Sequence, residues 1–307
     1  MIGYKKILMI FIILPVIYLR AMDGNKDRVL DNFFTKIRSA QPETFPAIES
    51  IQANIKTEIT FSQETLAVIQ PFINNISKES MSNVLTGTGD IKIKFTNIDG
   101  KNKAEYIYLY FNNPLLNFVF TKSGDDIEIV LPKMGIIIKD NINEIEKIMN
   151  QYKQQIDKQK STFPSNIAKE TINYIIANEN IIREKIKMKE KTGEKDGVKT
   201  YIFNYPVNDG NLNIEIFDKY WSFASISFSD KNKSFIRMDY SIPDKKSGYF
   251  IYLPETILLQ KEEKGNKLST ELSDIKYNLL FSNNDFKILN MNFQEFTAFM
   301  YLKLLQR

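Results

Sequence analysis

The chain has 307 residues, of which 43% are hydrophobic and 25% charged, and it contains no Cys and no His. This composition is typical of a globular protein that is long enough to bury a sizeable core. Without Cys and His the chain lacks disulfides, a lipid-modified Cys and the usual zinc, copper or iron ligands, so we expect no metal and no other cofactor. The net charge is +4, and Lys5, Lys6 and Arg20 supply three of these positive charges. The nearly neutral remainder predicts no nucleic-acid partner.

Residues 1–22 have the charge order of a secretory signal peptide. Lys5 and Lys6 precede an apolar run at 7–19, and the small residue Ala21 follows it. This run is short for a membrane span, so we expect export and cleavage of the leader. A retained anchor is the alternative, because Leu19-Arg20-Ala21 is an imperfect cleavage site.

After the leader, the first expected element is an amphipathic helix over 27–38. Its apolar residues recur at helical spacing: Val29, Leu30, Phe33, Phe34 and Ile37. Pro42 and Pro46 end this helix, and the alternation at 50–61 predicts a strand with one irregularity. The stretch 64–84 is expected to be helical around Pro71.

Strand signals return at Gly89 and continue to about residue 140. DIKIKF is followed by a turn at Asp99-Gly100 and by AEYIYLYF, FVF, DIEIVL and MGIIIKD. In AEYIYLYF, alternation places three tyrosines on one side and Ile107, Leu109 and Phe111 on the other. We expect this strand to be covered on both faces.

Residues 142–187 have helical periodicity, with a break at Pro164 and a possible cap at Ser165 or Asn166. A turn-rich linker at 189–197 then leads to an antiparallel meander over 199–289. One face of this meander should carry residues at spacing two: Ile214, Ile216, Ile226, Phe228, Met238, Tyr240, Ile257 and Leu259. Aromatic residues at helical spacing near the C-terminus predict a closing helix that packs on a core or acts as a lid.

The order of these segments, and the cadence of the second meander, resemble the LolA/LolB-like superfamily of periplasmic lipoprotein carriers and outer-membrane lipoprotein-sorting proteins. The clearest match is 252–278, a strand entered through Leu253-Pro254, a turn at KGNK and a strand that ends at Ser273-Asp274-Ile275. This stretch and its cadence cover about a third of the chain. The large helical insertion and the absence of Cys depart from the pattern, and the absence of Cys favours the soluble carrier.

The resemblance implies an α+β fold with an open, strongly curved antiparallel β-sheet, an incomplete barrel with helices on its concave side. It implies a single domain over 23–307 with a helical insertion at about 142–187. The superfamily's cavity-controlling Arg has only Arg38 and Arg237 as candidates here. The aromatic residues that we expect at a lipid-binding surface are Tyr106, Tyr108, Tyr110, Phe118, Phe120, Trp221, Phe223, Phe296 and Phe299.

The function that the resemblance implies is a soluble, monomeric periplasmic carrier. It would bind lipoprotein acyl chains or another lipid, and its partners would be lipidated proteins and transfer proteins of the inner and outer membranes. The alternative is a non-catalytic envelope module that binds a protein partner or senses stress. An enzyme is the third hypothesis, but its candidate carboxylates, Asp125, Asp126 and Glu215, have the sequence context of turn and outer-face residues. We therefore expect no catalytic residues.

Overall fold

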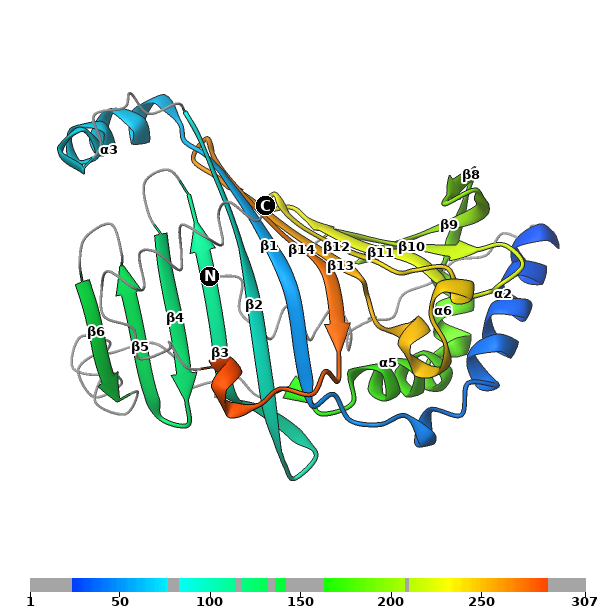
Figure 1. The fold of residues 1–307 in the computed structure, drawn as a ribbon. Helices are drawn as coiled ribbons and strands as arrows, with labels where there is room; N and C mark the ends of the chain where they lie inside the picture. Colours follow the sequence, from blue (N-terminus) through cyan, green and yellow to red (C-terminus); the bar gives the residue numbers. More distant parts are fainter. Residues whose placement is uncertain are drawn as a thin grey trace. The chain divides into compact units, whose positions relative to one another are not determined.

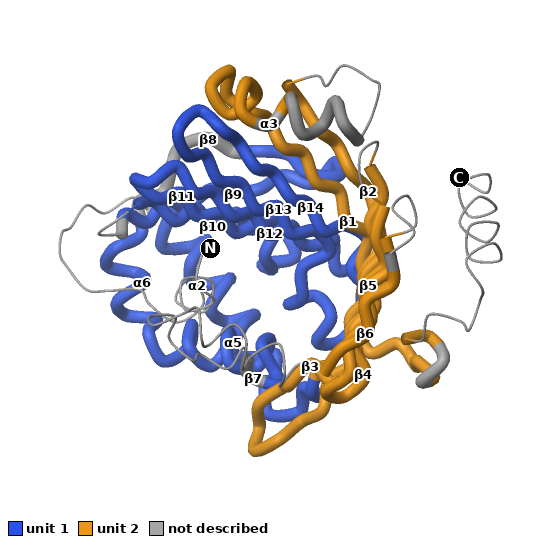
Figure 2. The backbone as a smooth tube through the Cα atoms, turned by 90° about the vertical axis from the view of Figure 1, so that its left-hand side faces the viewer, with its two compact units in different colours: residues 1–47, 163–275 blue, residues 48–162, 276–307 orange. Residues whose placement is uncertain are grey.

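A computed structural model describes residues 24–76, 83–113, 117–131, 136–141, 163–207 and 210–286. The chain divides into two compact units (Figure 2). Unit 1 consists of Met1–Ala47 and Phe163–Ile275, and unit 2 consists of Ile48–Thr162 and Lys276–Arg307. The expected leader, the first helix of the expected insertion and the expected closing helix lie outside the described residues.

Unit 1 contains an antiparallel meander of seven strands in the order β14-β13-β12-β11-β10-β9-β8. Its strands are β8 (Lys187–Lys195), β9 (Val198–Val207), β10 (Gly210–Phe217), β11 (Phe223–Asp230), β12 (Ser234–Asp239), β13 (Thr256–Glu263) and β14 (Asn266–Tyr277). The predicted common face is confirmed, because Ile214 pairs with Ile226, Ile226 with Met238, and Met238 with Ile257. Unit 1 also contains the two-residue strand β7 (Phe163–Pro164) and the 3-10 turns η3 (Pro243–Lys245) and η4 (Gly248–Tyr252).

Helices cover the apolar face of the unit 1 sheet (Figure 2). They are α2 (Gly24–Arg38), the turn η1 (Pro42–Thr44), α5 (Ile167–Ala177) and α6 (Glu179–Lys185). All five apolar residues predicted for the first helix are buried, and Phe33 lies 5.4 Å from Phe223 of β11 between ring centroids. Burying this stripe supplies most of the helix's stability, since short isolated helices are marginal in water.

Two predictions for unit 1 need correction. The helix expected to run to residue 187 is present as two helices, α5 and α6, interrupted at Asn178, whose side chain donates a hydrogen bond to the Tyr174 carbonyl and whose backbone is not helical. The expected linker at 189–197 is mostly strand β8, which pairs with β9 and leaves only Asp196-Gly197 as the turn. Edge strands are often rich in charged residues, so β8 has the composition of a linker.

Unit 2 contains six antiparallel strands in the order β6-β5-β4-β3-β2-β1 (Figure 1). They are β1 (Ser50–Thr60), β2 (Val84–Ile98), β3 (Lys101–Asn112), β4 (Asn117–Ser123), β5 (Asp126–Leu131) and β6 (Ile136–Asn141). The helix α3 (Gln63–Ile76) lies beyond one end of β1 and β2, and the 3-10 turn η5 (Asn283–Phe286) follows β14 in the chain. The helix predicted around Pro71 is present as α3, but Val84, the last residue of the predicted stretch, belongs to strand β2.

Two details of unit 2 differ from expectation. Strand β1 pairs with β2 from Ser50 to Thr60 without a register shift, so the predicted irregularity is absent from this pairing. Strand β2 begins at Val84 rather than near Gly89. Gly87 and Gly89 do not form a turn; they lie inside the strand, where neighbouring atoms leave little room for a side chain. The turn at Asp99-Gly100 is present, and both residues have positive φ.

The predicted fold class is confirmed as an α+β fold built on antiparallel sheet, and the strand order within each unit does not close on itself. Helices lie on one face of the sheet in unit 1, as expected. In the described part of the chain, no helix is long and apolar enough to span a membrane. The single domain over 23–307 stays a prediction.

Candidate functional site

The strands of unit 2 give their sheet two faces of different composition. Directly opposed residues in an antiparallel pair project to the same face. Leu109 of β3 pairs with Ile91 of β2 and with Phe120 of β4, so these three side chains share one face. Tyr108 pairs with Lys92 and Thr121, which therefore lie on the other face.

We call the first of these the aliphatic face. It carries apolar side chains from each of the strands β1 to β5: Ile51, Ala53, Ile55, Ile59, Leu85, Ile91, Ile93, Phe95, Ile107, Leu109, Phe111, Phe118, Phe120, Ile127, Ile129 and Leu131. Ile138 of β6 continues it and is 43% exposed. The only charged side chain on it in β2 to β5 of the described chain is that of Lys122, at one end.

Most side chains of the aliphatic face are only half-buried. Ile91, Leu109 and Phe120, at its centre, all keep part of their surface in solvent, whereas Ala53 and Ile127 are buried. The apolar face of the unit 1 sheet behaves differently over β9 to β12, where helices cover it and residues such as Phe203 and Ile216 are buried. A contiguous, partly exposed apolar surface on a folded protein commonly marks a binding surface.

Aromatic rings form one end of the aliphatic face. The ring of Phe111 lies over Gly87, where a Cβ atom would come within 2.1 Å of the ring. A Cβ on Gly89 would meet the Tyr110 carbonyl oxygen at 1.9 Å, so both positions of β2 require glycine. Phe118 of β4 packs beside Phe111, with 5.5 Å between ring centroids.

At the other end, Lys122 is buried. Its Nζ donates hydrogen bonds to the carbonyls of Ala104 and Glu105, at 2.8 and 3.3 Å. Burial, together with the nearby Lys103, holds the pKa of this ammonium below its ordinary value. Since its protons are directed at backbone carbonyls, Lys122 stabilises the bulge between β2 and β3 and leaves the middle of the face free of charge.

The opposite face, which we call the tyrosine face, is covered by the segment after β14. Phe286 is buried and lies 5.5 Å from the Tyr106 ring, and Asp285 forms a salt bridge with Lys92 at 3.8 Å. Burial, and secondarily the charge of Asp90, raises the pKa of Tyr108. The tyrosine face is thus at least partly a packed internal surface.

The structure separates the residues that the sequence suggested for lipid binding. Phe118 and Phe120 lie on the aliphatic face, whereas Tyr106, Tyr108 and Tyr110 lie on the tyrosine face. The aliphatic residues around Leu109 were not predicted, because aromatic residues were expected to form the lipid-binding surface. The alternation of Ile91 and Ile93 with lysines was the available signal.

Of the two candidates in unit 1, Phe223 is buried and Trp221 is partly exposed, and the last two candidates are not described. Trp221 stacks on Tyr201, and Phe223 is 1% exposed between Phe33 and Tyr240. Phe296 and Phe299 lie outside the described residues.

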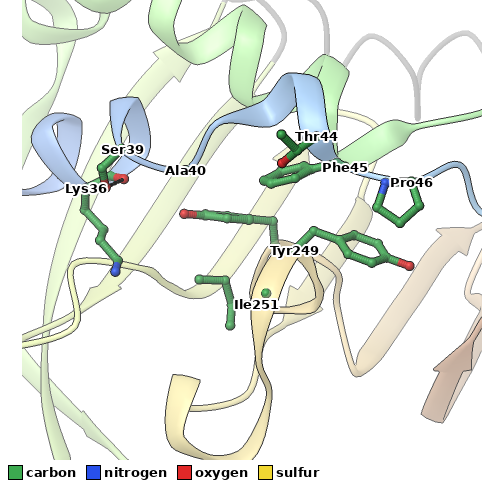
Figure 3. Close-up of a pocket in the computed structure, with 10 residues that line it drawn as sticks. Lys36, Ser39, Ala40, Thr44, Phe45, Pro46, Tyr249 and Ile251 are labelled. Atoms are coloured by element: carbon green, nitrogen blue, oxygen red, sulfur yellow. Dashed lines mark hydrogen bonds between the residues drawn. The ribbon is translucent and has the colours of Figure 1, made fainter.

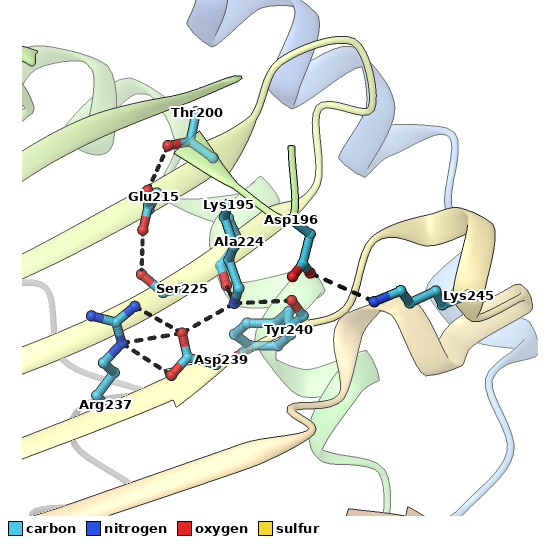
Figure 4. Close-up of polar contacts among 10 residues, drawn as sticks. All are labelled: Lys195, Asp196, Thr200, Glu215, Ala224, Ser225, Arg237, Asp239, Tyr240 and Lys245. Carbon is cyan, nitrogen blue, oxygen red and sulfur yellow. Dashed lines mark hydrogen bonds and ion pairs between the residues drawn. The ribbon is translucent and has the colours of Figure 1, made fainter. Parts of the chain in front are cut away.

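The two arginine candidates form ion pairs. Arg38, at the end of α2, binds Glu179 at 2.7 Å. Arg237 of β12 binds Asp239, which also accepts a hydrogen bond from Lys195 (Figure 4). Lys195 donates further to the carbonyls of Ala224 and Tyr240, at 2.7 and 3.2 Å. This network joins β8 to β11 and β12.

The three carboxylates that were candidates for catalysis are either hydrogen-bonded to neighbouring strands or exposed at a turn. Glu215 accepts hydrogen bonds from the hydroxyls of Thr200 and Ser225 (Figure 4). Asp125 and Asp126 are exposed at the turn between β4 and β5. In the part of the chain that is described, no group of three or more acidic residues could hold a metal ion.

No known protein family and no curated protein matches this sequence. Among solved structures, it is similar to a DUF1329 family protein from Desulfovibrio piger, with 12% identity, a TM-score of 0.32, and coverage of 86% of this chain and 99% of that one. A putative outer membrane lipoprotein-sorting protein domain from Vibrio parahaemolyticus is 11% identical, with a TM-score of 0.30 over 86% and 97%. A LolA superfamily protein from Nitrosomonas europaea is 12% identical, with a TM-score of 0.30 over 84% and 97%. These neighbours include the superfamily that the sequence resembles, and at such TM-scores they give no information about ligand or activity.

Proposed function

We propose that this protein is a non-catalytic periplasmic carrier that binds the acyl chain of a lipid or lipidated protein on the aliphatic face. The observation that carries the proposal is the partial exposure of apolar side chains over five neighbouring strands of unit 2. A surface of this kind is costly in water unless something covers it for part of the functional cycle.

The energetics of this surface suit a carrier. Each methylene that an acyl chain buries contributes about 0.8 kcal/mol, so a chain of about twelve carbons could gain up to roughly 9 kcal/mol before the costs of binding. Those costs cancel much of the gain, which leaves binding reversible. Among the described residues of β2 to β4, no charged side chain lies in the middle of the face around Leu109, where it would oppose the chain.

Transfer of a lipoprotein to the outer membrane is the finer part of this proposal. A carrier must receive its cargo from one membrane and release it at another, so we propose transfer proteins at the inner and outer membranes as partners. Export through the leader at 1–22 would place the protein in the periplasm, where we expect a soluble monomer.

A protein-binding envelope module is the competing function, and strand β6 favours it. Within the described residues β6 pairs with β5 alone, and Ile137 and Ile138, on its two faces, are 51% and 43% exposed. An edge strand with exposed apolar residues can accept an extended segment of a partner through backbone hydrogen bonds.

Extraction of the purified protein distinguishes the two functions. Protein from the envelope fraction should release acyl chains into organic solvent, detected by mass spectrometry at close to one per molecule. The Leu109→Asp variant should lose them, and Leu280→Asp, at a fully exposed position, should retain them. A parent protein that carries no acyl chain but retains a stoichiometric protein partner would support the module instead.

A further inference from the structure

Unit 1 contains a pocket of about 460 Å³ at the end of α2 (Figure 3). The last turn of α2 and the segment around η1 form one side of it, and η4 forms the other. Its lining includes Lys36, Ser39, Ala40, Phe45, Tyr249 and Ile251. The volume lies within the range of small-molecule sites, about 300 to 1,000 Å³.

An aromatic cluster forms the wall of this pocket. Phe45 stacks on Tyr252 at 5.6 Å between centroids and lies 5.9 Å from Tyr249. Both tyrosines are largely buried, at 9% and 7% exposure, so the wall is held in place by packing. Burial raises the pKa of Tyr252 to about 12. Ile251 adds an aliphatic surface to the same side.

Lys36 is the only charged side chain among the residues that line this pocket within the described chain. It is exposed, and its ammonium forms no salt bridge with any described residue. The other basic residue of that helix turn, Arg38, is bound to Glu179. Within the residues that the structure describes, the pocket therefore combines an unpaired positive charge with a lining that contains no carboxylate.

The helix dipole alone does not account for this arrangement. A Lys in the last turn of a helix is favourable because it interacts with the free carbonyls there. Here those carbonyls have other partners: the Ser39 hydroxyl donates to the Lys36 carbonyl at 2.7 Å, and the Ala40 amide donates to the Ile37 carbonyl at 3.1 Å. The Lys36 ammonium is thus not required as a cap.

We propose that this pocket binds a small organic anion with an aromatic or compact apolar body. Its carboxylate would pair with Lys36, and its body would lie against Phe45, Tyr249 and Ile251. The Ser39 and Thr44 hydroxyls donate to backbone carbonyls, which leaves Lys36 as the group that recognises the charge. The site lies within unit 1 and needs no residue of the aliphatic face, so it extends beyond lipid carriage.

Isothermal titration of the mature chain with 4-phenylbutyrate tests the proposal, and 4-phenylbutyramide serves as the uncharged probe. The carboxylate should bind with 1:1 stoichiometry, and the amide should bind about two- to fivefold more weakly, because the ion pair with an exposed ammonium is lost. Lys36→Gln should weaken carboxylate binding by a similar factor and leave amide binding unchanged. Lys267→Gln, which removes an exposed charge outside the pocket, should change neither affinity.

A second variant tests the location. Ala40→Phe fills the pocket and keeps Lys36, so it should abolish binding of both probes while circular dichroism shows a folded chain. Full binding by folded Ala40→Phe, or equal affinities of the parent for the two probes, would overturn the proposal. Leu109→Asp should bind 4-phenylbutyrate normally, so loss of the lipid function and loss of this site are separable.

Discussion

Replacing Leu109 by Asp places a carboxylate at the centre of the aliphatic face. Its neighbours across the strands are Ile91 and Phe120, and all three are half-buried. In the free protein the carboxylate can still reach water, so the fold should persist. An acyl chain that crosses β3 would have to desolvate it.

The expected loss of lipid affinity follows from the spacing between strands. Neighbouring strands are about 4.8 Å apart, which corresponds to roughly four methylenes of an extended chain. Loss of contact for three or four methylenes costs about 2.4 to 3.2 kcal/mol, a weakening of about 50- to 200-fold.

The assay is titration of a fluorescent long-chain fatty acid into the refolded, delipidated protein. Leu280→Asp, at a position that is fully exposed, is the matched control and should bind as the parent does. Folded Leu109→Asp with the parent's affinity would refute the assignment of the lipid site to this face. If that variant does not fold, Leu109→Ala should still weaken binding measurably, and unchanged affinity there would have the same consequence.

The remaining predictions concern stability and processing. Phe33→Ala should lower the free energy of unfolding by about 3 to 5 kcal/mol in urea titrations, because this ring is buried against β11, and fatty-acid affinity should not change; a loss below 1 kcal/mol would contradict the assigned packing. For Asp239, burial alone would raise the pKa, but hydrogen bonds from Arg237 and Lys195 outweigh it and hold the pKa below its ordinary 3.8. The unfolded chain therefore binds the proton more readily, so this stabilisation is present above about pH 4 and is lost as the pH falls below 3.8. Asp239→Asn should lower stability at pH 7 by about 1 to 3 kcal/mol and flatten its decline in acid, and parallel pH profiles for parent and variant would exclude this role. Intact-mass measurement of protein from the envelope should show the loss of about the first 21 residues, and retention of Met1 would indicate an anchored protein.

Local sequence patterns were sufficient to place most elements and their faces. The spacing of Val29, Phe33 and Ile37 predicted the buried stripe of α2, and alternation predicted which residues of β2 and β3 share a side. These features depend only on the periods of helix and strand, which each segment carries in itself. The family resemblance and the antiparallel fold class followed from the same cadence.

Register and coverage were decided by tertiary structure. The register of β3 with β4 decides whether Phe118 lies on the same face as Tyr110 or on the same face as Phe111, because a shift of one residue would exchange the two faces. The polar strand β8 forms because β9 provides backbone hydrogen-bond partners for it. The composition of β8 alone does not indicate a strand. Coverage likewise depends on distant segments: Phe286 covers part of the tyrosine face, while the aliphatic residues around Leu109 stay half-exposed. The sequence alone therefore determined that both faces exist, and only the fold decided which of them remains open to a ligand.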